Sequence, residues 1–455
     1  MYKKIITTIV FWFSLQLYGE NLTKLTLEKA IEYGLKNFEK IKSAKLNIEL
    51  LENRLFLAKL SPFTKWTIEG YLAPTPERHG NAIYTAQSDT YFGGEWGIVT
   101  GIGIKGGIPI NISRLWYLWR ILETGIEIEK LKVESEKIKL IEKIYRLYFG
   151  LATAYKLKKL LKMAKEYLEK GERYVEEELE KESGEVTEID RIKIKVYKEE
   201  LEGRELELSS SILEAKEALK LLTGIKTDFK VADLNLGAEE IELGSIEKYI
   251  RLGLKKRLEI KLSELAKLIL KRERRLLKAE LFPDIVLGIT ADYGYSNVVD
   301  DQINPFVKDP YNYLSAGFGL VFKWDLDYTT KYAKLKENRI KQEKLELETS
   351  LLKKAIKTEI ITSYKKLLES LKKVKRFNKA RRYARGWTTA IYQNIEAGVG
   401  EVKDLIDALK AYFEESINYY KSLYQLRINL LKFYIAIGKD SNEILKEMKE
   451  KLNRY

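Results

Sequence analysis

Two kinds of hydrophobic pattern divide the chain. From residue 402 onward, apolar residues recur at steps of three and four, which is the period of an amphipathic helix. The seven prolines all lie in residues 62–109 and 283–310, so two long stretches contain none. Because a proline inside a helix costs about 3 kcal/mol, these stretches predict long helices over about 114–182 and 328–396.

Four shorter segments alternate apolar and polar residues at every second position, which is the signal of a strand. They span about 63–72, 96–112, 284–295 and 313–325, and they come as two pairs joined by polar loops. Strands of about ten residues with one apolar face suit a transmembrane β-barrel, although an ordinary half-buried hairpin has the same local pattern. The long helices offer no obvious globular core to cover these faces, which favours the membrane.

The N-terminus has the layout of a secretory signal peptide, assigned to residues 1–19. Lys3 and Lys4 precede an apolar run that is short for a membrane-spanning helix, and Gly19 lies at a plausible cleavage position. No later segment has the roughly 18 consecutive apolar residues that a spanning helix needs. We therefore expect an exported protein with a cleaved signal and no transmembrane helix.

The chain repeats one order of elements: helix, strand, loop, strand, long helix, turn and helix. The first repeat covers residues 20–225 and its long hairpin turns near 184, while the second covers 246–438 and turns near 398. A connector (226–245) joins the repeats, and a C-terminal tail (439–455) follows the second.

The number of strands bears on assembly. A closed transmembrane barrel needs at least about eight strands, and an open sheet edge in lipid would leave backbone groups unpaired. Four strands per chain therefore predict that several chains share one barrel, and three chains would supply twelve.

The composition excludes most kinds of catalytic and metal-binding site. The 455 residues include no cysteine and a single histidine, His79, in a loop without companion ligands. Residues 101–106 fit GxGxxG formally, but they lie within an alternating strand rather than before a helix, so we reject a dinucleotide site. Ser209–Ser211 lie in a predicted helix with no base in sight. We expect no enzyme activity, no cofactor and no metal site.

The charge is strongly basic but finely mixed. Lysine and arginine total 81 against 67 acidic residues, a net charge of +14, and the lysines alternate with glutamates along the helical stretches. This pattern is typical of solvated helix faces, and no nucleic-acid-binding signature is present. We expect no nucleic-acid partner.

Three strings carry a resemblance to a known family: 25-LTLEKAIEYGLKNFEKIKSA-44, 281-LFPDI-285 and 398-GVGEVKDLIDALKAY-412. With the duplication, they make nearly all of the mature chain resemble the TolC-like outer-membrane efflux proteins. The resemblance implies an α+β membrane protein, a homotrimer whose 12-stranded outer-membrane barrel continues into a periplasmic α-helical barrel. It also implies a passive exit duct of a tripartite efflux pump or type I secretion system, with a periplasmic adaptor and an inner-membrane transporter as partners.

The resemblance assigns residues to a constriction and to its closing link. Asp404 and Asp407 match the acidic residues of the family's periplasmic constriction, and their i, i+3 spacing places them on one helix face. Acids also suit the first turns of a helix without any pore role. Asp190 matches a carboxylate that ties the hairpins together in the closed state. Gly400 stands where an arginine is often found, and Lys403 is either its substitute or a solvated lysine.

The hairpin turns, with Gly184, Gly398 and Gly400, are the adaptor contacts that the resemblance implies. Two departures from the family pattern are Phe38, where a proline is frequent, and 325-DLDYTT-330, which lacks a glycine-rich turn. The absence of cysteine excludes the N-terminal lipid anchor of some members.

A rival interpretation is a periplasmic coiled-coil adaptor or another structural protein, which would also be exported and rich in long helices. Such an adaptor predicts one compact all-β end domain. Here the strands form two separated hairpins that repeat together with the helices, which favours the channel.

Overall fold

The structure of this chain is a computed structural model, and it describes residues 23–79, 89–90, 94–181, 186–232, 241, 243–302, 306, 308–397 and 401–452. The predicted signal peptide, residues 1–19, lies outside the described residues. So do the three turn glycines, Gly184, Gly398 and Gly400.

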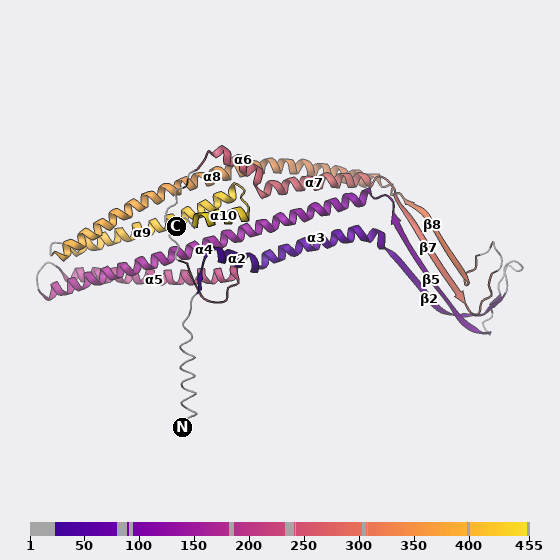
Figure 1. The fold of residues 1–455 in the computed structure, drawn as a ribbon, viewed down its shortest axis with the longest axis horizontal. Coiled ribbons are helices and arrows are strands. Elements are labelled where there is room, and N and C mark those ends of the chain that lie inside the picture. The colour runs from indigo at the N-terminus through magenta and orange to yellow at the C-terminus, as the bar shows by residue number, and fades with distance from the viewer. Residues whose placement is uncertain are drawn as a thin grey trace, which may run out of the picture. The chain divides into compact units, whose positions relative to one another are not determined.

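Figure 1 labels the helices and the four strands of the main sheet. In chain order, the elements are β1 (Thr23–Leu25), α2 (Leu27–Asn37), α3 (Glu39–Thr64), β2 (Trp66–Pro76), β3 (Arg78–His79), β4 (Asp89–Thr90), β5 (Trp96–Pro109), α4 (Ser113–Glu180), α5 (Glu188–Thr223), β6 (Phe229–Val231), α6 (Ile246–Lys256), α7 (Leu258–Ala279), β7 (Asp284–Ser296), β8 (Tyr313–Lys323), α8 (Tyr328–Glu396), α9 (Val402–Ala436) and α10 (Ser441–Leu452). The long helices α4 and α8 lie in the two proline-free stretches.

The chain divides into two compact units that cut across the predicted repeats. One unit consists of residues 1–45, 131–261 and 350–455, and the other of residues 46–130 and 262–349. Each unit therefore combines segments from both halves of the sequence.

The first unit has a large apolar core. It contains side chains of α2, α4, α9 and α10, and Ile31, Tyr148 and Phe433 are almost completely buried in it. The Tyr148 hydroxyl donates a hydrogen bond to the Leu25 carbonyl at 2.9 Å, which ties α4 to β1. β1 pairs in parallel with β6, and α10 packs Ile444 into the same core. The connector and the tail thus contain a strand and a helix that were not predicted, although Ile444, Leu445, Met448 and Leu452 recur at helical spacing.

The same break in a helix occurs twice in this unit. Phe38 follows the last residue of α2 and its N–H donates to the Gly34 carbonyl at 2.9 Å, and Arg257 follows the last residue of α6 and its N–H donates to the Gly253 carbonyl at 3.0 Å. Phe38 has an extended backbone (φ −66°, ψ 121°), and Arg257 leaves the helical conformation with similar angles (φ −56°, ψ 134°). The chain therefore turns at Phe38 without the proline that is frequent in the resembled family.

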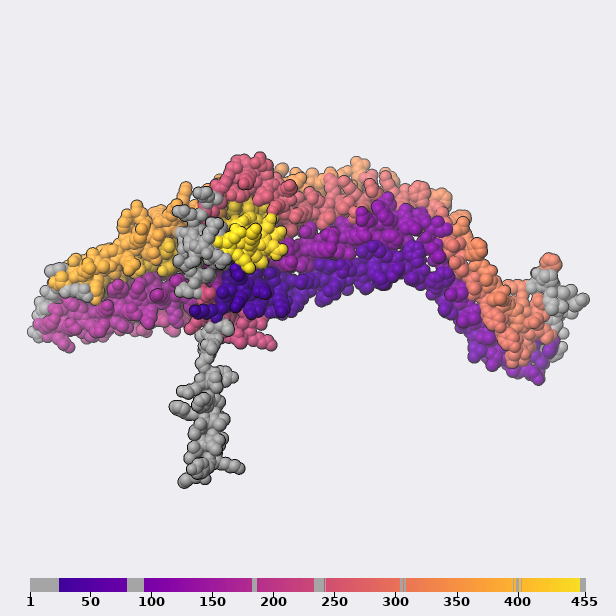
Figure 2. All heavy atoms as spheres, in the orientation of Figure 1, coloured from indigo at the N-terminus to yellow at the C-terminus, as the bar shows by residue number. Residues whose placement is uncertain are grey.

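The second unit contains a four-stranded antiparallel sheet in the order β2-β5-β7-β8. The sequence predicts two separate hairpins, but pairing of β5 with β7 joins them into one sheet. In Figure 2 the purple atoms of the first pair lie directly beside the orange atoms of the second. Both halves of the sequence therefore contribute to one continuous surface.

The first strand begins later than predicted because α3 continues through Pro62 to Thr64. A proline has no N–H to donate to the carbonyl four residues earlier, which is that of Ala58. The indole N–H of Trp119 donates a hydrogen bond to that carbonyl oxygen instead, at 2.8 Å. Within the described ranges, no helix has a stretch that is both long and apolar enough to cross a membrane.

Candidate functional site

The helical hairpins α4–α5 and α8–α9 share one apolar core in the halves nearest their turns. Each of the four helices contributes nearly buried side chains, among them Leu168, Ile194, Ile395 and Leu405. This packing fixes how α5 and α9 are rotated, and it therefore decides which of their side chains face outward.

Asp404 and Asp407 lie in the first turns of α9 on its outward side. The side chains between them, Leu405 and Ile406, are 2% and 6% exposed, whereas both aspartates are exposed. The predicted i, i+3 pair is thus brought to one accessible helix face. Their place in a channel constriction stays a prediction.

A shallow groove of about 340 Å³ runs between α5 and α9 beside this pair. Ile189, Ile192 and Val196 form its apolar wall on α5, and each is more than half exposed. Its charged lining consists of Lys193, Glu200, Lys403, Asp407 and Lys410. The groove is thus an aliphatic strip with a predominantly basic rim, and it includes one of the two predicted constriction residues.

Asp190 has local partners at the start of α5. Its carboxylate accepts hydrogen bonds from the Thr187 N–H at 3.2 Å and the Thr187 hydroxyl at 2.7 Å, and it pairs with Lys193 Nζ at 3.0 Å. Partial burial alone would raise the pKa of Asp190, but the bonds from Thr187 and Lys193 outweigh it and hold that pKa below its usual value. Between the described residues Asp190 and Lys403 no ion pair is formed, so the predicted closing link stays a prediction.

The sheet of the second unit has two chemically different faces, because successive side chains point to opposite sides. One face is exposed and apolar; it includes Ile68, Leu72, Ile98, Ile102, Ile104, Tyr293, Leu314, Phe318, Leu320 and Phe322. The other face is rich in glycine, serine and threonine. Residues 101–106 lie inside β5, as the alternation predicts.

Charged residues inside these strands occur only on the face rich in small residues. They are Glu69, Lys105 and Asp292, whereas Asp284 and Lys323 occupy strand ends. The alternation in the sequence already places all three residues at polar positions, but it does not distinguish them as a site.

Both edges of the sheet are unpaired in the part of the chain that the structure describes. β2 pairs with β5 alone and β8 with β7 alone. Trp66 begins β2 and Trp324 follows β8, so both exposed indoles lie at the same end of the sheet. Tryptophan is enriched where a membrane-spanning surface meets water.

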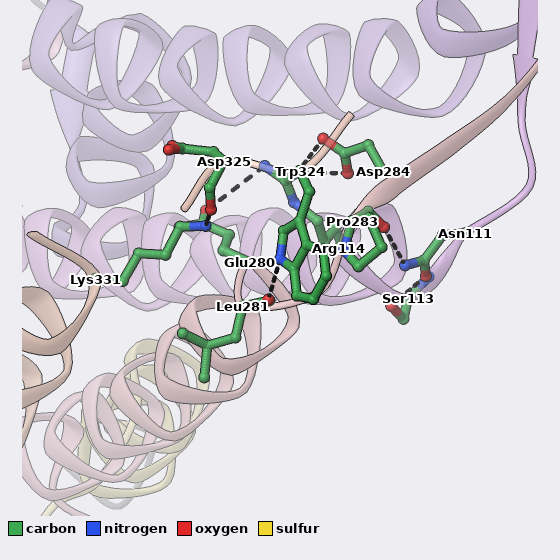
Figure 3. Close-up of polar contacts among 10 residues, drawn as sticks. All are labelled: Asn111, Ser113, Arg114, Glu280, Leu281, Pro283, Asp284, Trp324, Asp325 and Lys331. Carbon is green, nitrogen blue, oxygen red and sulfur yellow. Dashed lines mark hydrogen bonds and ion pairs between the residues drawn. The ribbon is translucent and has the colours of Figure 1, made fainter. Parts of the chain in front are cut away.

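Polar contacts fix the junction where strands pass into helices (Figure 3). Arg114 Nη1 lies 2.6 Å from both carboxylate oxygens of Asp284, so the first turn of α4 is joined to the start of β7. Asn111 Nδ2 donates to the Pro283 carbonyl at 3.5 Å, and the Trp324 indole donates to the Leu281 carbonyl at 3.0 Å. These contacts therefore join segments from the two halves of the sequence at the end of the sheet where its strands meet the helices.

The segment 325-DLDYTT-330 caps α8 in place of a glycine-rich turn. The Thr330 N–H donates to Asp327 Oδ1 at 3.0 Å, and hydrogen bonds from Thr330 hold the pKa of Asp327 below its ordinary value. Lys331 Nζ donates to the Asp325 carbonyl, as Figure 3 also shows.

His79 has carboxylate neighbours, contrary to the sequence-based expectation of an isolated histidine. Its Nδ1 lies 3.3 Å from Asp300 Oδ2 and its Nε2 lies 3.6 Å from Glu77 Oε2. Asp300 is 221 positions away in sequence, which is why no local pattern reveals it. The two carboxylates face opposite ring nitrogens, and among the described residues no group of three or more metal-ligating side chains converges.

Comparison with solved structures identifies the fold. No family model matches the chain, and no curated protein matches it by sequence. Among solved structures, the open MtrE outer membrane channel of Neisseria gonorrhoeae matches with a TM-score of 0.71 at 15% identity, covering 90% of this chain and 88% of that one. The outer membrane protein VceC of Vibrio cholerae matches with a TM-score of 0.69 at 13% identity, covering 90% and 96%.

A third match is the CmeC outer membrane channel of Campylobacter jejuni, with a TM-score of 0.65 at 15% identity, covering 93% of this chain and 89% of that one. The matches extend over almost the whole length of both partners. The chain therefore has the fold of these outer-membrane channels, and the predicted TolC-like fold is confirmed.

Proposed function

We propose that this protein is an outer-membrane channel that conducts cargo passively out of the cell, as the exit duct of an efflux pump or a type I secretion system. Its signal peptide directs export and is then removed. Three copies form one twelve-stranded barrel in the outer membrane, and their long helices form a tunnel in the periplasm. The similarity in fold to outer-membrane channels supports this proposal.

The observation that carries the proposal is the open sheet with an exposed apolar face. Strands of 11 to 14 residues are long enough to cross a bilayer at a tilt. An unpaired edge in hydrocarbon costs several kcal/mol for each backbone group, so the edges at β2 and β8 require partners. A second copy supplies them when its β8 pairs with β2 of the first.

The helices that flank the two edge strands also have unpartnered apolar faces. On α3, Leu46, Leu50 and Leu57 are 56%, 57% and 52% exposed, and their spacing puts them on one side of the helix. On α8, Ile340 and Leu347 are 54% and 74% exposed at a spacing of seven. Each such side chain contributes about 1.5–3 kcal/mol when it is fully buried. These faces are suited to contact between neighbouring copies.

The constriction lies at the hairpin turns, where Asp404 and Asp407 provide two acidic rings in the trimer. Exposed carboxylates that face a narrow water-filled passage attract cations. The groove between α5 and α9 adjoins this pair, and it provides the contact for a periplasmic adaptor together with the turns at Gly184, Gly398 and Gly400. An inner-membrane transporter supplies the energy.

Conductance in planar bilayers tests the channel and its constriction together. We expect the purified wild type to give cation-preferring steps, and Asp404→Asn/Asp407→Asn to insert equally well but to prefer cations less. As a matched control, Glu28→Gln/Glu32→Gln removes two acids from helix α2. This control is expected to keep the wild-type selectivity.

Two results would contradict the proposal at different points. Stable insertion of the wild type without any conductance would refute the channel. A conducting wild type whose selectivity is unchanged in the Asp404→Asn/Asp407→Asn double variant would refute the acidic constriction and leave the channel standing.

A further inference from the structure

We propose that Glu69, Lys105 and Asp292 form a second ion-selective site, inside the barrel and separate from the hairpin turns. The site favours cations and small cationic solutes over anions. This inference rests on the proposed channel, since it takes the face of the sheet rich in small residues to line the pore.

The register of the sheet brings the three side chains together although they lie on three strands. Glu69 is opposite Gly103, and Gly103 is opposite Asp292, so the two acids share one row across the sheet. Lys105 is two residues further along β5 on the same face. Its Nζ lies 3.2 Å from Glu69 Oε2.

Gly103 creates the space in which the carboxylate of Asp292 lies. A Cβ atom at this position would be 2.3 Å from Asp292 Oδ1, so the carboxylate would have to move away. The Asp292 carboxylate therefore lies over Gly103, the residue of β5 that is paired with Glu69. The Thr290 hydroxyl donates to its other oxygen, Oδ2, at 2.8 Å.

The placement of charge is one-sided. Inside the strands, the exposed apolar face has no charged side chain, whereas the opposite face has these three. On the lipid side of a barrel near the bilayer midplane, an arginine or lysine costs about 2–4 kcal/mol and an aspartate or glutamate somewhat less, whereas a charge on the lumen side tunes selectivity. The side chains of Glu69 and Lys105 are 64% and 57% exposed, so both are accessible to passing solutes.

The charges do not cancel. Lys105 compensates Glu69, and Asp292 leaves each chain with one uncompensated negative charge at this level of the sheet. In the proposed trimer, three such charges surround the passage. A ring of carboxylates raises the local concentration of cations and lowers that of anions.

Opposite charge changes should move the selectivity in opposite directions. In planar bilayers under a KCl gradient, Asp292→Asn should lower the potassium-to-chloride permeability ratio, and Lys105→Gln should raise it. Each change should be about threefold at roughly 0.1 M salt and much smaller at 1 M, where the screening length falls to about 3 Å. Lys59→Gln, which breaks a Lys–Glu pair of 3.4 Å between α3 and α4, is the matched control and should leave the ratio unchanged.

The outcomes separate this site from the channel itself. A wild type that inserts but does not conduct refutes the proposed function. Conducting variants whose permeability ratios equal that of the wild type, or that shift in the same direction as each other, refute the site. If one variant fails to insert, the direction in which the permeability ratio of the other variant changes still tests the site, because each substitution has its own predicted direction.

Discussion

Gly34 offers a direct test of the packing in the first unit. It lies in α2 against fully buried Ile144, and a Cβ atom at this position would be 2.5 Å from Ile144 Cδ1 and 3.3 Å from the Leu222 carbonyl oxygen. Gly253 in α6 has the same surroundings: its Cβ would be 2.4 Å from Ile360 Cδ1. We expect Gly34→Ala and Gly253→Ala each to destabilise the protein.

The magnitude follows from two opposing terms. Adding a methyl group to a closely packed core typically costs about 1–3 kcal/mol, because neighbouring side chains and backbone must shift. Replacing a helical glycine by alanine returns about 0.5–1 kcal/mol through lower backbone entropy in the unfolded chain. The midpoints of these ranges leave a net loss of about 1 kcal/mol, with an upper bound of about 2.5 kcal/mol, and a unit of this size loses about 2 °C in Tm per kcal/mol.

Thermal unfolding of the purified protein, followed by circular dichroism, measures this loss. Gly203→Ala is the matched control, because Gly203 is also helical and a Cβ atom there meets nothing within 4 Å. We expect Gly203→Ala to raise Tm slightly and Gly34→Ala to lower it. If the two variants shifted Tm equally, the close approach of α2 to α4 would be refuted.

Two further expectations concern ion pairs. Asp284→Asn removes the contact with Arg114. Because both side chains are partly exposed, we expect a loss of local stability of about 0.5–1 kcal/mol, measured as faster proteolysis at the junction. The proteolysis rate of Arg114→Lys should lie between those of the wild type and Asp284→Asn. Proteolysis at the wild-type rate would contradict a structural role for this pair. Burial alone would raise the pKa of Glu259, but the bond from buried Arg257 outweighs it and lowers that pKa. The stabilisation by the ionised Glu259 carboxylate is therefore fully present above the ordinary glutamate pKa of about 4.3. It is lost as the pH falls through the lower pKa that Glu259 has in the folded protein. In chemical unfolding, Glu259→Gln should have a lower free energy of unfolding than the wild type at pH 7, and this difference should disappear towards pH 3. The exposed Glu264→Gln variant should show no such difference. A loss of stability in Glu259→Gln that does not depend on pH would refute the linkage.

Local patterns predicted the elements of this fold better than their pairing. Alternation located the four strands and their two faces, because a strand's side chains alternate whatever its partner is. It could not predict that β5 pairs with β7, since these strands belong to different halves of the sequence. Nor could it show that α3 continues through Pro62, because the indole of Trp119 that satisfies the freed carbonyl of Ala58 lies 61 positions away.

The candidate sites divide in the same way. Asp404 and Asp407 were predictable as a pair because their spacing alone puts them on one helix face. The contact of Glu69 with Lys105 depends on strand register, and the place of Asp292 depends on the missing side chain of Gly103. Short elements were missed for another reason: a three-residue strand such as β1 has too few positions to show any period.

The order of strands in the sheet bears on the entropy of assembly. One edge, β2, comes from the first half of the sequence and the other, β8, from the second, so the proposed contact between copies pairs the two halves as β5 and β7 do within one chain. A ring of six half-sized subunits would need five association steps, whereas three duplicated chains need two. Each step costs at least about 4 kcal/mol in lost translational and rotational freedom, so covalent linkage of the halves spares the assembled ring on the order of 10 kcal/mol or more. The linkage also fixes the ratio of the two halves, so every closed ring contains β2 and β8 edges in equal number.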